Sequence, residues 1–305
     1  MTDELVHGWK AAAALVGKSE RHIRQLAADR NLVVSRRQDG AVALRRTDLE
    51  ALGAELHTLQ DETLAGRWLA SARALARHCP PGSLEEIRGQ LRQPGCVLFE
   101  GAQGVLLDEG RGFHPHTTWS SINTSVAEGV AARFGIVVPI EHYGVMRTYL
   151  TRHGAGPLPT HDQSLDAHLP EPHNSGAGWQ GAFRRGHPDA VLLQYALAAT
   201  GRLSGLFISH LGVFQQDVSL KWCERYSVEP PLPPGMRYAE RIPLGVREDL
   251  DHQRSLTHLL QSARPLYHAE PIRSAPDFLK RLTGVTSLPV AFCSYGATWA
   301  DVREK

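Results

Sequence analysis

The fold class of this chain is decided by one stretch, residues 96–108, which reads CVLFEGAQGVLLD. Its apolar start, Cys96 to Phe99, predicts a short strand, and the glycines that follow predict a tight turn. Further strand candidates recur along the chain, at Val145 to Leu150, Leu206 to Ser209 and Leu288 to Cys293. Helical patterns separate them, such as Thr124 to Phe134 and Asp189 to Thr200. Strands that alternate with helices in this way predict an α/β domain.

The sequence before this domain divides into a connector and a small N-terminal module. A helix is predicted from Asp61 to His78, with an apolar face that we expect to pack on a neighbouring element. A Pro-Pro-Gly run at 80–82 ends it, and Ser83 and Glu86 have the spacing of a capping box for a further helix. We therefore expect three parts: a module at 1–58, connector helices at 59–94 and the α/β domain at 95–305.

The N-terminal module shows the order helix, turn, helix, wing, helix. Trp9 to Val16 predicts a short helix that Gly17 ends, and Glu20 to Arg30 predicts a second helix. Two apolar runs, Leu32 to Ser35 and Ala41 to Leu44, flank an Asp-Gly pair and predict a hairpin. The last helix is expected to open at Thr47, because Thr47 and Glu50 have capping-box spacing, and to run through Leu56.

This order and its text resemble the winged helix-turn-helix of excisionase and MerR-type DNA-binding proteins. The resemblance implies that the second helix lies in the major groove, with the wing beside it. The implied DNA contacts are Arg21, His22, Arg24, Gln25, Arg36 and Arg37. Between Lys18 and Arg46 there are eight basic and three acidic side chains, a surplus that suits phosphate. The alternative is an interaction module that no longer touches DNA.

Composition excludes several classes of protein. With 42% hydrophobic and 21% charged residues among 305, the chain has an ordinary globular composition, and a net charge of +1 is unlike that of a protein coated with nucleic acid. No apolar run is long enough for a bilayer, so we expect a cytoplasmic protein with no membrane contact. Four scattered cysteines predict neither disulfides nor a zinc site, and the 16 histidines lack metal-ligand spacing, so no metal is expected.

Three blocks in the α/β part resemble adenylosuccinate synthetases, in the family's order, over Val97 to Asp301. The first is FEGAQG at 99–104, followed by LLD at 106–108 and by HPHTTW at 114–119, where the family has YPxVTS. The second, TRHGAGPLPT at 151–160, matches the family's TRxGxGPxPT, and the third, GHPDAV at 186–191, parallels GWLDxV. The resemblance predicts a synthetase-like α/β domain preceded by the winged helix-turn-helix.

The resemblance also implies a site for a purine nucleotide. Gln103 would contact the base and Thr118 the phosphate of an inosine monophosphate-like ligand, since a carboxamide both donates and accepts hydrogen bonds and a hydroxyl suits a phosphate oxygen. Gly101 and Gly104 would let the backbone approach that ligand. Arg152 is the cationic candidate beside the nucleotide. The alternatives are a tight turn without ligand and a proline-stiffened surface loop whose arginine is salt-bridged.

The chain departs from the family wherever the family handles the activating phosphate. The GDEGKGK phosphate loop is absent, so the implied domain lacks a P-loop and no catalytic residue can be named. The family's guanine-reading TKLD corresponds to Ser-His-Leu-Gly at 209–212, and its STGPDR to Ser-Tyr-Gly-Ala-Thr-Trp at 294–299. Of the arginine-rich loop that grips aspartate, Arg184 and Arg185 survive, and they are the candidates for an aspartate-like second ligand. The leading arginines of that loop are missing, so the resemblance implies an altered second ligand or none.

Three functions are compatible with these observations. The first is a DNA-binding regulator that responds to a purine nucleotide, with an operator read by a homodimer. The second is a C–N ligase of the adenylosuccinate synthetase type, whose phosphate site is supplied by a partner or an unfamiliar site. The third is a non-catalytic assembly or toxin-neutralising partner. Mg²⁺ and a nucleoside triphosphate are expected only for the ligase, and no other cofactor is expected.

Overall fold

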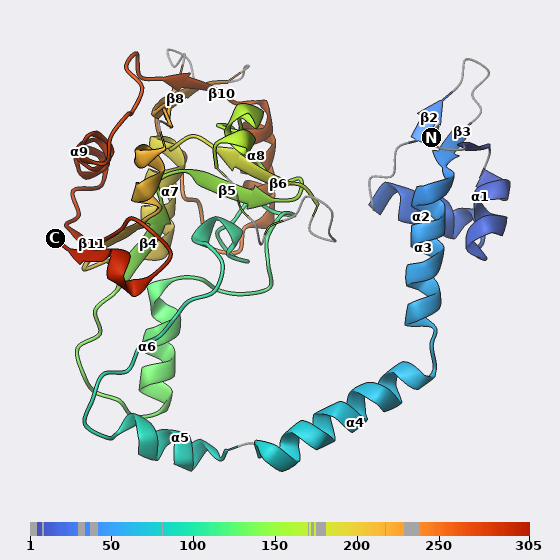
Figure 1. Ribbon diagram of the computed structural model, residues 1–305, viewed down its shortest axis with the longest axis horizontal. Coiled ribbons are helices and arrows are strands. Elements are labelled where there is room, and N and C mark those ends of the chain that lie inside the picture. Colours follow the sequence, from blue (N-terminus) through green and yellow to red (C-terminus); the bar gives the residue numbers. More distant parts are fainter. Residues whose placement is uncertain are drawn as a thin grey trace. The chain divides into compact units, whose positions relative to one another are not determined.

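The computed structural model describes residues 5–7, 9–29, 34–36, 42–80, 82–169, 171, 174, 181–216, 218–228 and 238–305. The chain forms two compact units, Met1–Ile87 and Arg88–Lys305 (Figure 1). No helix in these ranges is both long and apolar enough to cross a membrane.

The N-terminal unit contains two short helices, a small sheet and a longer third helix. Its elements up to residue 59 are β1 (Leu5–His7), α1 (Trp9–Val16), α2 (Glu20–Asp29), β2 (Val34–Arg36), β3 (Val42–Arg45) and α3 (Arg46–Leu59). Gly17, with φ +71°, ends α1 as predicted, since a side chain is disfavoured at that dihedral angle. The antiparallel sheet has the order β1-β3-β2, and β1 was not foreseen from sequence. Ile23, Leu44 and Leu49 are fully buried between sheet and helices.

Two further helices follow, α4 (Thr63–His78) and α5 (Leu84–Leu91). The predicted capping box is present, because the Ser83 amide donates to the Glu86 carboxylate and the Glu86 amide donates to Ser83 Oγ. Within its own unit α4 buries none of its residues, so the packing expected for its apolar face stays a prediction. Trp68 is 71% exposed and Leu75 is 67% exposed, and no residue of α4 is buried.

The second unit is built around a mainly parallel sheet with the order β12-β11-β7-β4. Its strands are β4 (Tyr143–Arg147), β7 (Gly205–Ser209), β11 (Val290–Ser294) and the antiparallel β12 (Val302–Glu304). The helices α6 (Thr124–Arg133) and α7 (Ala190–Thr200) lie within one residue of their predicted bounds, and α9 (Ala275–Thr286) precedes β11. Buried side chains such as Leu206, Ile208, Phe278 and Leu282 form the core. The predicted α/β architecture is thus confirmed.

Two strand predictions were wrong in detail. Residues 96–99, expected to be a strand, adopt no regular secondary structure, and Leu98 is 88% exposed. A strand is stabilised by its ladder of hydrogen bonds, and β4, the last strand of this sheet in the described ranges, pairs only with β7. The single run predicted at 145–150 divides into the end of β4 and the start of β5 (Leu150–His153).

Two smaller sheets and a further helix complete the unit (Figure 1). β5 pairs with β6 (Phe183–Gly186), and β8 (Cys223–Ser227) lies between β10 (Arg264–Tyr267) and β9 (Tyr238–Ala239). With α7 and α8 (Leu250–Ser262) they bury a second cluster that includes Phe113, Tyr195 and Tyr226. Short 3₁₀ turns occur at η1 (Val105–Leu107), η2 (Gln163–Ala167), η3 (Leu211–Gln215) and η4 (Trp299–Asp301).

The start of α7 is fixed by a buried carboxylate. Asp189 Oδ1 accepts hydrogen bonds from the amides of Val191 and Leu192, both at 3.0 Å, and Oδ2 accepts one from the Tyr226 hydroxyl. Asp189 is 4% exposed, and burial raises its pKa to about 6. The Asp of the third sequence block therefore ties α7 to the β8 sheet.

Candidate functional site

Gln103 lies on an exposed turn that leads directly into η1. Its φ is +61°, a left-handed value that is uncommon for a residue with a side chain. Gly104 caps η1, and its carbonyl accepts from the amide of Leu107 at 2.8 Å. A Cβ added at Gly101 or Gly104 would meet no atom within 4 Å. Packing within the described chain therefore does not require a glycine at either position.

Thr118 is held against the other end of η1. Its amide and its Oγ1 both donate to the Leu107 carbonyl, at 2.9 and 3.1 Å, and Oγ1 lies 3.0 Å from Ser120 Oγ. The chain of bonds from Gly104 through Leu107 to Thr118 thus joins the first sequence block to the segment that resembles YPxVTS. Because the Thr118 hydroxyl donates its proton to the Leu107 carbonyl, Oγ1 can act toward a ligand only as a hydrogen-bond acceptor.

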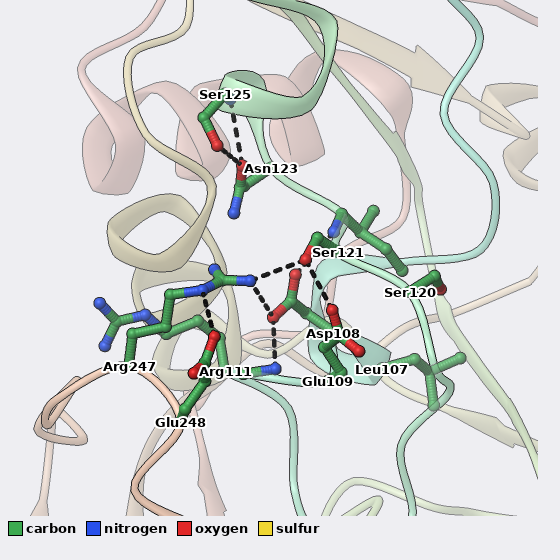
Figure 2. A network of polar contacts seen from close by, with 12 residues as sticks. Leu107, Asp108, Glu109, Arg111, Ser120, Ser121, Asn123, Ser125, Arg247 and Glu248 are labelled. Carbon is green, nitrogen blue, oxygen red and sulfur yellow. Dashed lines mark hydrogen bonds and ion pairs between the residues drawn. The ribbon is translucent and has the colours of Figure 1, made fainter. Parts of the chain in front are cut away.

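A buried carboxylate organises the loop between these two segments (Figure 2). Asp108 is fully buried; Oδ1 accepts from the Gly110 amide at 2.8 Å and Oδ2 from the Ile122 amide at 2.6 Å. Arg247 Nη2 lies 3.6 Å from Asp108 Oδ1 and donates to Ser121 Oγ at 2.8 Å. Ser121 donates in turn to Glu109 at 2.9 Å. The loop is therefore fixed by an arginine from a distant part of the sequence.

A shallow hollow of about 740 Å³ lies beside this network. Its charged lining consists of three arginines and one glutamate, which are Arg111, Arg133, Arg247 and Glu248. The N-terminal turn of α6, where Asn123 accepts from the Ser125 amide at 3.1 Å, adds amide and hydroxyl groups. This lining has a surplus of positive charge, but none of the sequence-predicted nucleotide residues contributes to it.

Arg152 is buried on β5, with 9% of its surface exposed. Its Nη2 donates to the His116 carbonyl at 2.7 Å, which ties the second sequence block to the segment containing Thr118. Burial, with a contribution from the charge of Arg184, lowers the pKa of Arg152 to about 10. Burial and the same two guanidiniums lower the pKa of His116. Arg152 is thus an internal cation and not the salt-bridged surface arginine of the alternative interpretation.

The two arginines expected to share a second ligand lie on opposite faces of β6. Successive side chains of a strand point to opposite sides, and Arg185 points inward, 8% exposed. Its Nη1 pairs with Asp166 at 2.8 Å and its Nε donates to the Leu169 carbonyl at 2.6 Å. Arg184 is half-buried and donates to the carbonyls of Gly154 and Gly156. The structure does not bring Arg184 and Arg185 together, and it uses Arg185 in an internal ion pair.

The guanine-reading position of the family is closed by the chain itself. A Cβ at Gly212 would lie 2.0 Å from the Tyr295 carbonyl oxygen, so no side chain fits there without movement of the backbone. The Tyr295 amide donates to the Asp301 carbonyl at 3.1 Å, and Thr298 and Asp301 form a capping box that fixes the same turn. The two departures from the family sequence therefore pack against each other, and an aspartate side chain does not fit at position 212 without movement of the backbone.

The DNA-binding candidates of α2 form an exposed face. Arg21, His22, Arg24 and Gln25 are all exposed, while Ile23 between them is buried. Arg24 pairs with Glu20 at 3.2 Å and lies 5.7 Å from the centroid of the Trp9 ring. Of the wing candidates, Arg36 is in β2, but its side chain and the whole of Arg37 lie outside the described residues.

The structure shows site residues that the sequence did not assign. Asp108 belongs to the Leu-Leu-Asp segment of the first block, but the sequence assigned it no role. Arg247 and Ser121 had no local signal, because their partners are remote in sequence. Gln103, Thr118 and Arg152 come from three segments that hydrogen bonds join, and their role in one nucleotide site stays a prediction.

Comparison with known proteins identifies the family of the chain. The family model for adenylosuccinate synthetase matches residues 18–302. The adenylosuccinate synthetase of Syntrophotalea carbinolica is 29% identical over 257 residues, which are 78% of this chain and 54% of the relative. That of a Synechococcus species is 30% identical over 255 residues, with the same two shares, and that of a Cyanothece species is 32% identical over 77% of this chain.

A solved structure is similar in fold. The fully ligated adenylosuccinate synthetase from Plasmodium falciparum superposes with a TM-score of 0.59 and 17% identity, over 85% of this chain and 62% of that one. The chain spans about half the length of the relatives it matches in sequence. The family match begins at Lys18 and so includes most of the N-terminal unit. By sequence, by fold and by the order of its site segments, the chain belongs to the adenylosuccinate synthetase family.

Proposed function

We propose that this chain is the nucleotide-binding half of a C–N ligase of the adenylosuccinate synthetase type, and that a partner polypeptide or an unfamiliar site supplies the activating phosphate. The observation that carries the proposal is the hydrogen-bonded path from Gly104 through Leu107 to Thr118. It holds the two segments with the family's nucleotide motifs in one arrangement. Preorganised loops of this kind lower the entropic cost of holding a ligand.

The ligand of this site is proposed to be a purine nucleotide. Gln103 is exposed on its strained turn, where its carboxamide is available to a purine edge, and Thr118 Oγ1 retains acceptor capacity. Open space around Gly101 and Gly104 leaves room for the approach of the ligand. Arg152 is a buried cation that contacts the Thr118 segment by donating to the His116 carbonyl. Nucleotide binding by these residues requires no phosphate loop.

The site that binds and transfers the activating phosphate is proposed to lie outside the described residues. No glycine-lysine phosphate loop of the family's kind occurs in the sequence, and the Gly212 position is filled by the Tyr295 carbonyl. The main protein contribution to phosphoryl transfer is electrostatic stabilisation by a lysine-bearing loop and metal ions. A ligase of this type therefore needs Mg²⁺ and a nucleoside triphosphate at a site outside these residues.

Isothermal titration of the purified chain with purine nucleotides, with and without aspartate, tests the binding part. Removal of one buried hydrogen-bonding group costs about 1–3 kcal/mol, so Gln103→Ala should weaken binding by roughly 5- to 150-fold. Gln90→Ala, at another exposed glutamine, is the matched control and should bind like the wild type. Equal affinity of Gln103→Ala and the control would contradict the proposal.

A second function, a nucleotide-responsive DNA-binding regulator, is favoured by one specific observation. The described elements of the N-terminal unit have the order helix, turn, helix, hairpin, helix, with an exposed face of arginine, histidine and glutamine on α2. In this proposal the module is residues 1–58, followed by a connector at 59–94 and the synthetase-like domain at 95–305, in a cytoplasmic homodimer. Operators read by such modules are usually two-fold symmetric, which is the reason for proposing a dimer.

Fluorescence anisotropy with a random-sequence duplex tests this second function. Loss of one phosphate contact weakens binding uniformly across sequences and lowers the salt slope by about one. Arg21→Gln should show both effects, whereas Arg202→Gln, on an exposed loop of the other unit, should show neither. Light scattering tests the dimer. Absence of DNA binding at low salt, or a monomer at micromolar concentration, would count against the regulator.

A further inference from the structure

One edge of the central sheet is unpaired in the described ranges. β4 pairs with β7 over its whole length, and no described strand pairs with its other edge. β7 and β11 run parallel to β4. The edge of a strand presents a row of N–H and C=O groups without partners, which is a template for pairing with another chain. A further strand can therefore be added at the open edge of β4.

The hydrogen bonds around β4 identify the backbone groups that face this open edge. The His142 carbonyl accepts from the Ser204 amide at 2.7 Å, on the β7 side. The Thr148 amide donates to the Ser209 carbonyl at 3.2 Å, on the same side. Successive residues of a strand direct their backbone groups to alternate edges, so the even-numbered residues bond to β7. The odd-numbered residues face the open edge, and they are Tyr143, Val145 and Arg147.

Apolar side chains lie along the open edge. Val145 is 69% exposed and Tyr143 is 41% exposed. The register places Val145 beside Phe207 and Phe207 beside Phe292, so these three side chains share one face of the sheet. The Tyr143 and Phe292 rings are in contact, with 5.7 Å between their centroids. This apolar row ends uncovered at β4, whereas Ile208 on the opposite face is fully buried.

Two apolar segments outside regular secondary structure are also exposed. Val137 and Val138, which lead into β4, are 95% and 61% exposed. Residues 97–99, from the run that was expected to form a strand, are all exposed as well. The chain before each segment comes close to the other, because a Cβ added at Gly135 would lie 3.5 Å from Arg92 Nη2. Apolar side chains exposed in this number along a strand and its approach indicate an interface.

The comparison with relatives indicates which molecule covers this surface. The chain spans about half the length of the relatives it matches, and its sequence contains no phosphate loop of the family's kind. A mainly parallel sheet is normally covered on both faces, so the uncovered end at β4 is a place where the remaining part of the fold can continue. A second copy of this chain would bring the same part again. Two β4 strands related by a two-fold axis would also pair antiparallel, unlike β4, β7 and β11.

We propose that the open edge of β4 and the exposed apolar side chains beside it are the docking surface for a separate polypeptide that carries the phosphate loop, and that this partner adds a β-strand to β4. The inference rests on the proposed function, because it identifies where the partner of that ligase binds. The added strand bonds to the outward N–H and C=O groups of β4. Apolar side chains of the partner cover Val145, Tyr143 and the segments 97–99 and 137–138.

Co-expression of the full chain with the complementary part of a relative tests the docking surface. The probe is the part of the Syntrophotalea carbinolica adenylosuccinate synthetase that this chain does not match. We expect a one-to-one complex in size-exclusion chromatography with light scattering. The amides of Val145 and Arg147 should exchange more slowly in the complex, whereas those of Gly144 and Met146, which bond to β7, should change little. This alternation distinguishes strand addition from general shielding of the surface.

Three variants connect the complex to this edge. Val145→Lys places a charge on the edge, a device by which natural proteins prevent strand pairing, and it should weaken the complex at least about tenfold because a buried valine is replaced by an unpaired charge. Val246→Lys, the matched control, changes a 75% exposed valine in the loop before α8 and should bind like the wild type. Leu98→Lys alters no regular secondary structure, so it replaces Val145→Lys if that variant fails to fold, and it should also weaken the complex.

The inference is overturned if no complex forms, or if Val145→Lys and Leu98→Lys bind the probe as tightly as the wild type. It is also overturned if the chain alone forms a dimer that Val145→Lys dissociates, since a second copy then occupies the edge. Slow exchange of the Val145 amide in the dilute chain alone would overturn it too, because the edge is then covered within one chain.

Titration of the same samples with purine nucleotides separates this result from the proposed function. A chain that binds a nucleotide but forms no complex contradicts the docking surface alone. A complex that forms through β4 without any nucleotide binding supports the docking surface and contradicts the nucleotide site of the proposed function.

Discussion

Replacement of Asp189 separates the geometric role of this side chain from its charge. Asp189→Ala removes the cap of α7 and leaves the buried Tyr226 hydroxyl without its acceptor. Loss of an N-cap costs about 1 kcal/mol, and a buried donor without a partner costs about 1–3 kcal/mol, so the free energy of unfolding should fall by about 2–4 kcal/mol. Asp189→Asn keeps an acceptor for the two amides of α7, and its amide group can donate to Tyr226, so its cost at neutral pH should be smaller.

The pH dependence of stability adds a second, independent signature. Burial raises the pKa of Asp189 from its ordinary value of 3.8 to about 6, so between these values the folded state holds a proton that the unfolded state has released. Stability contributed by this group is therefore full below the lower value and is lost as the pH rises through about 6. A shift of about two units corresponds to at most about 3 kcal/mol. Asp189→Asn does not titrate, so its stability relative to the wild type should improve from about pH 4 to about pH 7.

Urea unfolding of the wild type and both variants at these two pH values measures all of these quantities. Matched m-values would show that the variants unfold from the same compact state. The reasoning is refuted if Asp189→Asn is as destabilised as Asp189→Ala at neutral pH. It is also refuted if the difference between wild type and Asp189→Asn is the same at both pH values.

Three other perturbations have definite expected outcomes. Gly212→Ala should lower the free energy of unfolding by about 1–3 kcal/mol in urea titrations, because its Cβ would overlap the Tyr295 carbonyl. Arg247→Met should cost about 1–3 kcal/mol, because Ser121 and Asp108 lose a charged partner; amide exchange at Gly110 and Ile122 should quicken in the variant. The purified chain with inosine monophosphate, aspartate, GTP and Mg²⁺ should form no adenylosuccinate detectable by chromatography, since it lacks the phosphate loop. Steady product formation that Gln103→Ala abolishes would show that this expectation is wrong.

Local signals in the sequence were sufficient for several elements. The turn at Gly17, the capping box at Ser83 and the helix that follows Asp189 were predicted from neighbouring residues, and the structure confirms them. The strand at 96–99 was predicted from its composition alone, but a strand also needs a neighbour, and none pairs with it in the described chain. The same limit applies to the exposed face of α4, whose amphipathic pattern indicates a partner without identifying it.

Contacts between distant residues account for most of what the sequence could not predict at the site. The ion pair of Arg247 with Asp108 joins segments with no local relation, so no motif could reveal it. Arg184 and Arg185 were read as one cationic pair because they are adjacent in sequence. The strand geometry of β6 separates them, and the antiparallel pairing of β5 with β6 puts Arg152 opposite Arg184 instead. The register between β5 and β6, which could not be predicted from the sequence, thus decides which charged side chains lie opposite each other.

The contact between Gly212 and the Tyr295 carbonyl also constrains how this chain can change by mutation. A single substitution that restores a carboxylate at Gly212 meets the backbone of the 294–299 turn before it can meet a guanine base. Restoring only that turn would leave no carboxylate for the base. Neither the carboxylate at 212 nor the altered turn is therefore useful without the other, and the carboxylate alone destabilises the fold. Such mutual dependence makes a carboxylate at this position difficult to introduce in single steps.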